Sequence, residues 1–166
     1  MNKPFQPVKS NLECEKIIQG TYQGVLSMVD GDEPYALPVN HAYQDGRFYF
    51  HCAASGRKLD VIQNNPHVTY VISKYYGDPE RLTKSLKCHG LWESVIAYGQ
   101  ARVISGREEL VAAFRTFMSY YGEANYQPSE DIFEKNRGIV IEVEKMTARR
   151  EYEDHHTDFW FWEKDA

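Results

Sequence analysis

The sequence has no long hydrophobic run, and its first residues contain no apolar segment. A membrane-spanning helix needs about 18 or more consecutive apolar residues, and no stretch of this chain approaches that length. Residues 1–10 also lack the apolar core of a secretory signal. We therefore expect neither secretion nor membrane insertion, and the cytoplasm is the simplest location.

Cysteine is scarce, and basic residues are not in excess. The three cysteines (Cys14, Cys52 and Cys88) are too few and too scattered for a disulfide framework, which agrees with a reducing compartment. Asp and Glu number 24 against 19 Lys and Arg, which gives a net charge of −5. Binding to nucleic acid without regard to sequence needs a basic face, so this class of function is not expected.

What the chain does contain favours one compact domain over residues 1–166. Hydrophobic residues make up 42% of the sequence, enough for a core. A chain of this length buries about 70% of the surface that its unfolded form exposes. The aromatic share is 14%, with 12 Tyr, which suits β-strands and a site that stacks on a flat ligand.

The hydrophobic pattern predicts a mainly β fold. Pro38 marks a sheet edge, a bulge or a departure of the backbone from the sheet, because proline cannot donate to a ladder. Turn signals at Asp30-Gly31-Asp32 and Asp45-Gly46 link the first strands without helices. Six strands are expected, at 22–29, 33–43, 47–52, 67–73, 92–104 and 138–143. Helical spacing predicts helices at 11–20, 55–65 and 107–121. A small barrel with short helices at its margins follows, rather than a doubly wound βαβ sheet.

Two connecting segments stand out from this pattern. Residues 74–91 form a long polar connection, and long loops in compact domains tend to be functional or mobile. The helix near 11–20 begins with Ser10 and Glu13 at the spacing of a capping box.

A short segment after the third strand indicates an anion site. Ser55 reads as the N-cap of the following helix, which places Gly56, Arg57 and Lys58 in the first turn. Cations there are unfavourable by about 0.3–1 kcal/mol each, because the helix dipole is positive at that end. A bound phosphate would remove this conflict, with Gly56 permitting close approach. Pairing between Asp60 and a basic neighbour is a simpler alternative.

Six short blocks along the chain carry a family resemblance. They are 24–30 (GVLSMVD), 34–40 (PYALPVN), 46–51 (GRFYFH), 56–60 (GRKLD), 65–68 (NPHV) and 92–101 (WESVIAYGQA). In this order they resemble the pyridoxamine 5′-phosphate oxidase-like flavoproteins, and within them the nitroimidazole-resistance or flavin-nucleotide-binding branch. The similarity covers about residues 11–145 and leaves 146–166 as a C-terminal tail.

The resemblance implies a six-stranded split barrel that forms a homodimer with FMN at the subunit interface. It places Pro38, Val39 and Asn40 beside the isoalloxazine ring and His51 near the flavin. Ser55, Arg57 and Lys58 would hold the phosphate, in agreement with the dipole argument. Ser94 and Val95 would also approach the cofactor, with the partner subunit as one possible source.

The histidines leave alternatives open. His51 suits a catalytic role in proton exchange because its ordinary pKa is near 6.5, but a packed histidine on an aromatic strand is the plain alternative. His41 is expected at the surface or in a wall. His155-His156 and the aromatic tail after it could form a lid or pack at an interface. The pairs His51-Cys52 and Cys88-His89 match no zinc spacing, so no metal is expected.

The function expected from the resemblance is an FMN-dependent oxidoreductase that passes reducing equivalents from NAD(P)H to a small aromatic or nitro substrate. No Gly-x-Gly-x-x-Gly fingerprint is present, so a nicotinamide would dock only transiently. The basic C-terminal pattern of true pyridoxamine phosphate oxidases is not found. The alternatives are a non-catalytic flavin carrier or sensor, and the same barrel holding haem or a deazaflavin.

Overall fold

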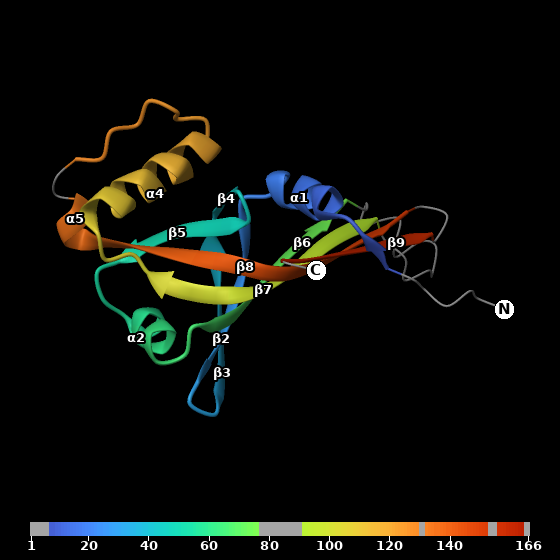
Figure 1. Ribbon diagram of the computed structural model, residues 1–166, viewed down its shortest axis with the longest axis horizontal. Coiled ribbons are helices and arrows are strands. Elements are labelled where there is room, and N and C mark those ends of the chain that lie inside the picture. Colours follow the sequence, from blue (N-terminus) through green and yellow to red (C-terminus); the bar gives the residue numbers. More distant parts are fainter. Residues whose placement is uncertain (1–6, 77–90, 130–131, 153–155, 165–166) are drawn as a thin grey trace.

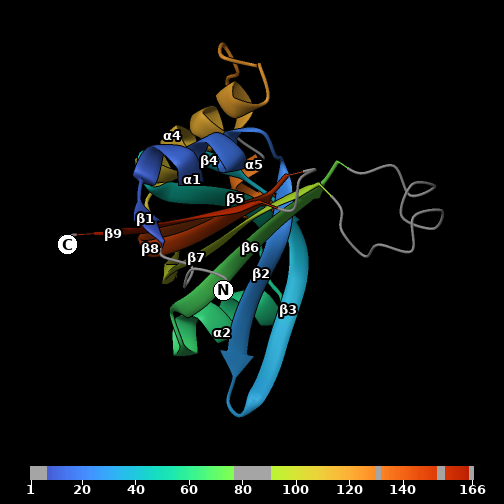
Figure 2. The ribbon, with the colours of Figure 1, turned by 90° about the vertical axis from the view of Figure 1, so that its right-hand side faces the viewer.

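The computed structural model describes residues 7–76, 91–129, 132–152 and 156–164, which form a curved mixed sheet with helices at its margins (Figures 1 and 2). The strands are β1 (Val8–Lys9), β2 (Gln23–Asp30), β3 (Glu33–Asn40), β4 (Ala42–Gln44), β5 (Arg47–Ala53), β6 (His67–Tyr75), β7 (Trp92–Val103), β8 (Asn136–Glu151) and β9 (Thr157–Glu163). The described helices are α1 (Asn11–Gln19), α2 (Arg57–Asn64), α4 (Arg107–Tyr120) and α5 (Ile132–Lys135).

The long strand β8 splits the sheet into two branches. Nearly its whole length pairs antiparallel with β7. Along its other edge, residues 136–142 pair with β5, and residues 145–151 pair with β9. The main path of the sheet then runs β8-β7-β6-β2-β3 and ends at β3. This open, branched sheet confirms the mainly β, split-barrel prediction.

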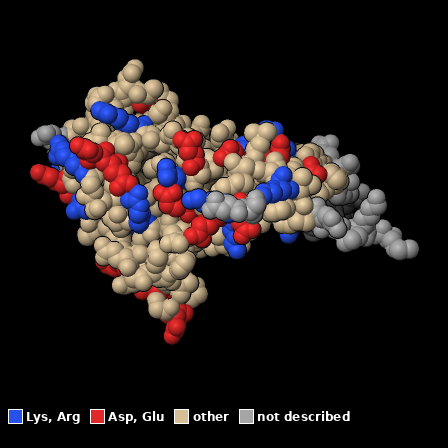
Figure 3. Space-filling view, viewed as in Figure 1, with Lys and Arg blue, Asp and Glu red and all other residues tan. Residues whose placement is uncertain are grey.

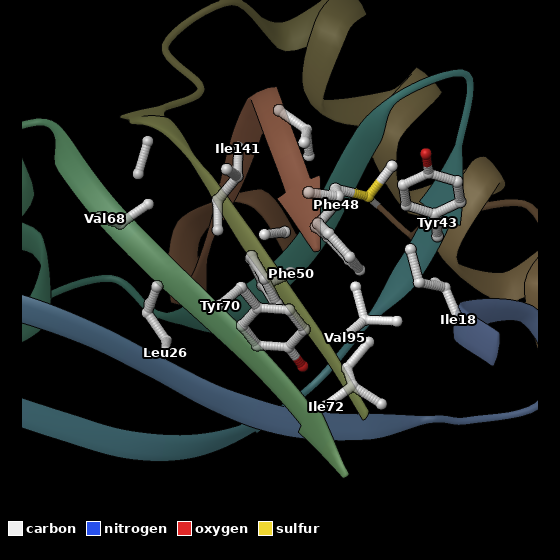
Figure 4. Close-up of a cluster of buried hydrophobic side chains, with 14 of the residues drawn as sticks. Ile18, Leu26, Tyr43, Phe48, Phe50, Val68, Tyr70, Ile72, Val95 and Ile141 are labelled. Atoms are coloured by element: carbon white, nitrogen blue, oxygen red, sulfur yellow. The ribbon is translucent and has the colours of Figure 1, made fainter. Parts of the chain in front are cut away.

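One face of this sheet forms the core. Leu26, Tyr70, Ala97 and Met146 are register partners on four successive strands, and at most 2% of each is exposed. Figure 4 shows Leu26, Tyr70 and Phe50 among the side chains that fill the space enclosed by the sheet. Helix α1 adds Cys14, Ile17 and Ile18 to the same cluster, and α2 adds Leu59, Val61 and Ile62. The strands alternate buried and exposed residues because successive side chains point to opposite faces.

The opposite face carries a row of apolar side chains that remains accessible. Val25, Val71, Ile96, Thr147 and Phe161 are register partners across five strands, and Pro38 extends the row onto β3. Val25 is 39% exposed, and the four residues that follow it are half-buried. We call this surface the open face.

The helices begin and end close to the predicted positions. The Glu13 N–H donates to Ser10 Oγ at 3.3 Å, so Ser10 caps α1 as expected. Helix α4 buries Leu110, Ala113, Phe114 and Phe117, and Met118 is half-buried. None of the described helices is long and apolar enough to cross a membrane.

The structure departs from the predicted strands at three places. The strand predicted at 33–43 is interrupted at His41 and forms β3 and β4. The strand predicted at 138–143 continues to Glu151, and the aromatic tail forms β9 against it. Residues 146–151 and 157–163 of the tail are therefore part of the sheet, and His155 lies outside the described residues. Most of the predicted 74–91 connection, from 77 to 90, also lies outside them.

Gly24 provides a test of the core packing beneath β3. A Cβ atom there would lie 2.6 Å from Tyr70 Cζ and 2.6 Å from the Val71 carbonyl oxygen. We expect Gly24→Ala to lower the free energy of unfolding by about 1–3 kcal/mol, because overpacking forces neighbours to shift. Urea denaturation measures this change. Gly20→Ala is the control, since its Cβ would approach no atom closer than 3.5 Å. Equal stability of the two variants would contradict the packing around Tyr70.

Candidate functional site

The first component of the site is β3, the end strand of the sheet path. Its register with β2 sets Pro38 opposite Val25 and Asn40 opposite Gln23, and the Gln23 amide donates to Asn40 Oδ1 at 3.3 Å. Pro38 and Asn40 are exposed, whereas Val39 between them is half-buried and packs against the core. The edge position predicted from Pro38 is confirmed.

The two prolines of β3 fix which backbone groups its free edge presents. Pro34 and Pro38 fit the ladder only where their nitrogens point away from β2, because proline has no N–H to donate. By the alternation of an antiparallel pair, the N–H groups of Ala36 and Asn40 point the same way. The edge therefore presents several carbonyl oxygens and two N–H groups to whatever lies beside it.

A buried hydrogen-bond chain braces this strand from inside. The Tyr70 hydroxyl donates to the Val39 carbonyl oxygen at 3.1 Å and lies 2.8 Å from His41 Nδ1. Because the tyrosine proton is used on Val39, His41 Nδ1–H donates to the tyrosine oxygen. The Val39 carbonyl and the Asn40 N–H belong to one peptide group, so polarising the carbonyl strengthens the Asn40 N–H as a donor.

His41 is fully buried, which corrects the expectation that it lies at the surface or in a wall. Rings of Phe48, Tyr70 and Tyr120 surround it at centroid distances of 5.3–6.0 Å. Its Nε2 has no hydrogen-bond partner among the described residues. Burial lowers the pKa of His41 to about 4, because a charged imidazole there would lose its hydration.

The second component is the start of α2, where the prediction of the cap was wrong. Gly56, not Ser55, is the N-cap, at φ 143°, and no side chain caps this helix. Ser55 lies exposed in the bend before it. A Cβ atom at Gly56 would meet nothing within 4 Å, so the space beside the first turn is open. Arg57 and Lys58 occupy the first turn, as expected.

Arg57 is already paired with carboxylates of the β2–β3 hairpin. Its Nε donates to Asp30 at 2.8 Å, and its Nη2 donates to Glu33. The guanidinium also lies 4.6 Å from the centre of the Tyr35 ring. Figure 3 shows acidic side chains at the tip of this hairpin, the lowest point in that view. Asp30 and Glu33 therefore neutralise one of the two cations, a pairing that the sequence did not indicate because they lie 24–27 residues away.

Lys58 has no such partner. It forms no ion pair with a carboxylate of the described residues, and it is half-buried. His51 on β5 is exposed, but its ring packs edge-on against Phe117 of α4 at 4.7 Å. Partial burial there, and then the charge of Lys58, lower the pKa of His51. His51 is therefore neutral and accessible near pH 7.

The two predicted residues of β7 lie on opposite faces of the sheet. Val95 is fully buried in the core, so its side chain faces no solvent. Ser94 is half-buried and pairs with Ser73 of β6 and with Arg149 of β8. Strands β6 and β2 lie between β7, which carries Ser94, and β3. At the usual strand spacing Ser94 is therefore about 14 Å from β3. Within one subunit Ser94 does not touch a group bound at the edge of β3.

Sequence reasoning missed the brace and the ion pairs. The proximity of Gly24 to Tyr70, and of Tyr70 to Val39, depends on the register of three strands.

Among the described residues, no group of three His, Cys, Asp or Glu side chains is arranged to hold a metal. Cys88 and His89, of the second zinc pair considered, lie outside the described residues.

The comparisons agree with this fold. The pyridoxamine 5′-phosphate oxidase family matches the chain over residues 10–150, so the chain belongs to this family. No curated protein gives a match.

Several solved structures are similar at low sequence identity. A protein assigned to 5-nitroimidazole antibiotic resistance, from Bacteroides thetaiotaomicron, has a TM-score of 0.71 at 21% identity, over 89% of this chain and 91% of its own. A FAD-binding protein from Mesorhizobium loti has a TM-score of 0.66 at 19% identity, over 86% and 96%. A heme-binding protein from Mycobacterium smegmatis has a TM-score of 0.61 at 17% identity, over 89% and 55%. At these identities the likeness shows the shared fold.

The buried His41 predicts a pH dependence of stability. Its folded pKa of about 4 lies below its ordinary value of 6.5, so its contribution is complete above pH 6.5 and is lost as the pH falls towards 4. The difference corresponds to about 3 kcal/mol. Between pH 6.5 and 4, we expect the free energy of unfolding of His41→Gln to fall by about 3 kcal/mol less than that of the wild type. Urea denaturation at several pH values measures this difference. His67→Gln, at an exposed position, should keep the wild-type slope. An unchanged slope in His41→Gln would contradict a neutral buried His41.

Proposed function

We propose that this protein binds FMN as a homodimer and works as an oxidoreductase. It passes reducing equivalents from NAD(P)H to a small aromatic or nitro substrate. The proposal rests on the described geometry and on family membership. Bound FMN would supply reversible electron and hydride transfer, and the protein supplies binding, orientation and electrostatics.

The observation that carries this proposal is the uncapped first turn of α2 beside Lys58. The N–H groups of Arg57 and Lys58 lie at the positive end of the helix, with no side chain capping them. Gly56 leaves open space next to them, and Lys58 has no carboxylate partner among the described residues. Such a corner fits a phosphate group. Arg57 contributes only by releasing Asp30 or Glu33, so Lys58 is the principal cation.

The free edge of β3 fits the flavin ring. Tyr35, next to Arg57, and Asn40 lie about 17 Å apart along the strand, so an extended mononucleotide can contact both ends. The pyrimidine edge of an isoalloxazine carries both donors and acceptors, and the edge of β3 offers carbonyls and the braced Asn40 N–H. Pro38 gives the ring an apolar contact.

A second subunit completes this site. Ser94 is too far from β3 within one chain but lies on the accessible side of the sheet, as Pro38 does. The open face presents apolar side chains that water would otherwise hydrate, and burying them against a second copy is favourable. Packing two open faces would bring Ser94 of one subunit towards β3 of the other. Structural relatives described as FAD-binding or heme-binding support a planar cofactor on this barrel.

His51 is the candidate for proton exchange with the bound flavin or its substrate. It is neutral near pH 7 because its pKa is lowered, so it can accept a proton. A carrier or sensor would use the same cofactor contacts and would not need this residue. Turnover therefore distinguishes the oxidoreductase from the non-catalytic alternative.

The phosphate corner is tested by substitution of its cations. We expect Lys58→Ala with Arg57→Ala to weaken FMN binding by at least about tenfold, or about 1.4 kcal/mol. Lys58→Ala alone should cause most of this loss, because Arg57 is shared with Asp30 and Glu33. Fluorescence titration with FMN measures the affinity. Lys16→Ala is the control, since Lys16 pairs with Glu13 on α1. Unchanged affinity in the double variant would show that the phosphate binds elsewhere.

Electron transfer is tested by stopped-flow absorbance of the FMN-loaded protein. We expect NADH or NADPH to bleach the flavin bands, and a nitroaromatic substrate to restore them. His51→Gln should slow one of these steps while FMN affinity stays unchanged, because His51 moves a proton and does not hold the phosphate. Tight FMN binding without bleaching by either nucleotide would favour the carrier or sensor.

A further inference from the structure

A second hollow lies at the opposite end of α2 from Lys58. It has a volume of about 740 Å³ and opens between α2, the end of β7, the start of α4 and the start of β8. Its apolar lining includes Ile62, Ile104, Leu110 and Phe133. Small-molecule sites usually have volumes of about 300–1,000 Å³ and mostly apolar walls. We call this hollow the arginine pocket, after the charged residues that line it.

The charged lining of this pocket is entirely basic. Arg102, Arg107 and Arg137 line it, and no Asp or Glu of the described residues does, although the whole chain carries a net charge of −5. Arg102 is neutralised by a two-point contact with Glu109 outside the lining. Arg107 lies over the Phe133 ring at 4.6 Å from its centre. The pocket thus combines apolar walls with guanidinium groups.

Arg137 is the residue with uncommitted donors. Its Nη1 donates to the carbonyl oxygens of Phe133 at 3.2 Å and Asn136 at 2.9 Å, which fixes the orientation of the guanidinium. Its Nε and Nη2 have no acceptor among the described residues, and it forms no ion pair with a described carboxylate. A half-buried, preoriented guanidinium with free donors matches a carboxylate, which accepts from it at two points.

We propose that the arginine pocket binds a small aromatic carboxylate, with its ring against Phe133 and Leu110 and its carboxylate on Arg137. The apolar walls favour an anion that carries a ring over free phosphate, because phosphate has no apolar surface to bury. Ile62 and Gln63 place one wall of the pocket at the last turn of α2, and Gln63 lies about 9 Å along the helix axis from Arg57. Arg137 itself is the register partner of Cys52, whose thiol lies within reach of the charges of both Arg137 and Lys58, so the test compares the protein with and without FMN.

Calorimetric titration of the full-length protein tests this site with three probes, before and after FMN loading. 2-Naphthoate should bind, its neutral isostere 2-naphthamide should bind at least about tenfold more weakly, and inorganic phosphate should not bind. Arg137→Gln should weaken naphthoate by at least about tenfold. Arg115→Gln, which alters an arginine of α4 outside the pocket, should leave its affinity unchanged.

A second variant guards against local misfolding in Arg137→Gln. Ser105 is exposed and lines the pocket mouth, so Ser105→Trp should block naphthoate without changing the thermal midpoint or FMN affinity. Equal binding of the acid and the amide, or full affinity in Arg137→Gln, would overturn the proposal. Displacement of naphthoate by FMN would also overturn it, because the probe would then occupy the flavin site.

Discussion

The backbone pairing of β8 is the constraint on which the rest of the structure depends. This strand pairs with β7 along one edge and with β5 and β9 along the other, so it joins both branches of the sheet. The register that it sets aligns Met146 with Ala97, and through β7 and β6 aligns Tyr70 with Leu26. A slip of one residue would exchange the core with the open face, because side chains alternate along each strand.

The same register places Tyr70 beneath the edge strand. Gly24 leaves the room that the ring needs, and the hydroxyl reaches the Val39 carbonyl with His41 behind it. The brace leaves His41 Nε2 in the core without a hydrogen-bond partner among the described residues, which costs free energy, and the cost is larger when the ring is charged. The protein thus gives up some stability at acid pH to hold one peptide group of β3. This loss of stability is consistent with a strand that must present a fixed edge to a ligand.

Much of the fold could be predicted because it follows from local signals. The turns at Gly31 and Gly46, the cap at Ser10 and the period of α4 lie within a few residues of the structure they specify. The tail was harder, because β9 is a strand only through its pairing with the second half of β8. The sequence named candidate segments for a site, but it did not indicate the contacts that these segments make. The pairing of Arg57 with Asp30, the burial of His41 and the distance of Ser94 from β3 all arise from tertiary register.

Two basic residues, Lys58 and Arg137, mark the candidate anion sites of the molecule. Four of the described arginines pair with carboxylates, among them Arg47 with Glu142 and Arg102 with Glu109. Lys58 and Arg137 lack such partners among the described residues; Lys58 lies beside the open start of α2, and Arg137 lines the arginine pocket. A cation without a carboxylate partner, next to open space, suggests an anionic ligand. The open start of α2 fits a phosphate, and the apolar walls of the arginine pocket fit a carboxylate that is attached to a ring.

A crystal structure of the protein grown with FMN tests the central claim most directly. The account predicts a phosphate within hydrogen-bond distance of Lys58 Nζ and the first N–H groups of α2, with the ring along the edge of β3 and the partner's Ser94 nearby. A structure in which this corner is empty and the flavin lies elsewhere, in the arginine pocket for example, would contradict it.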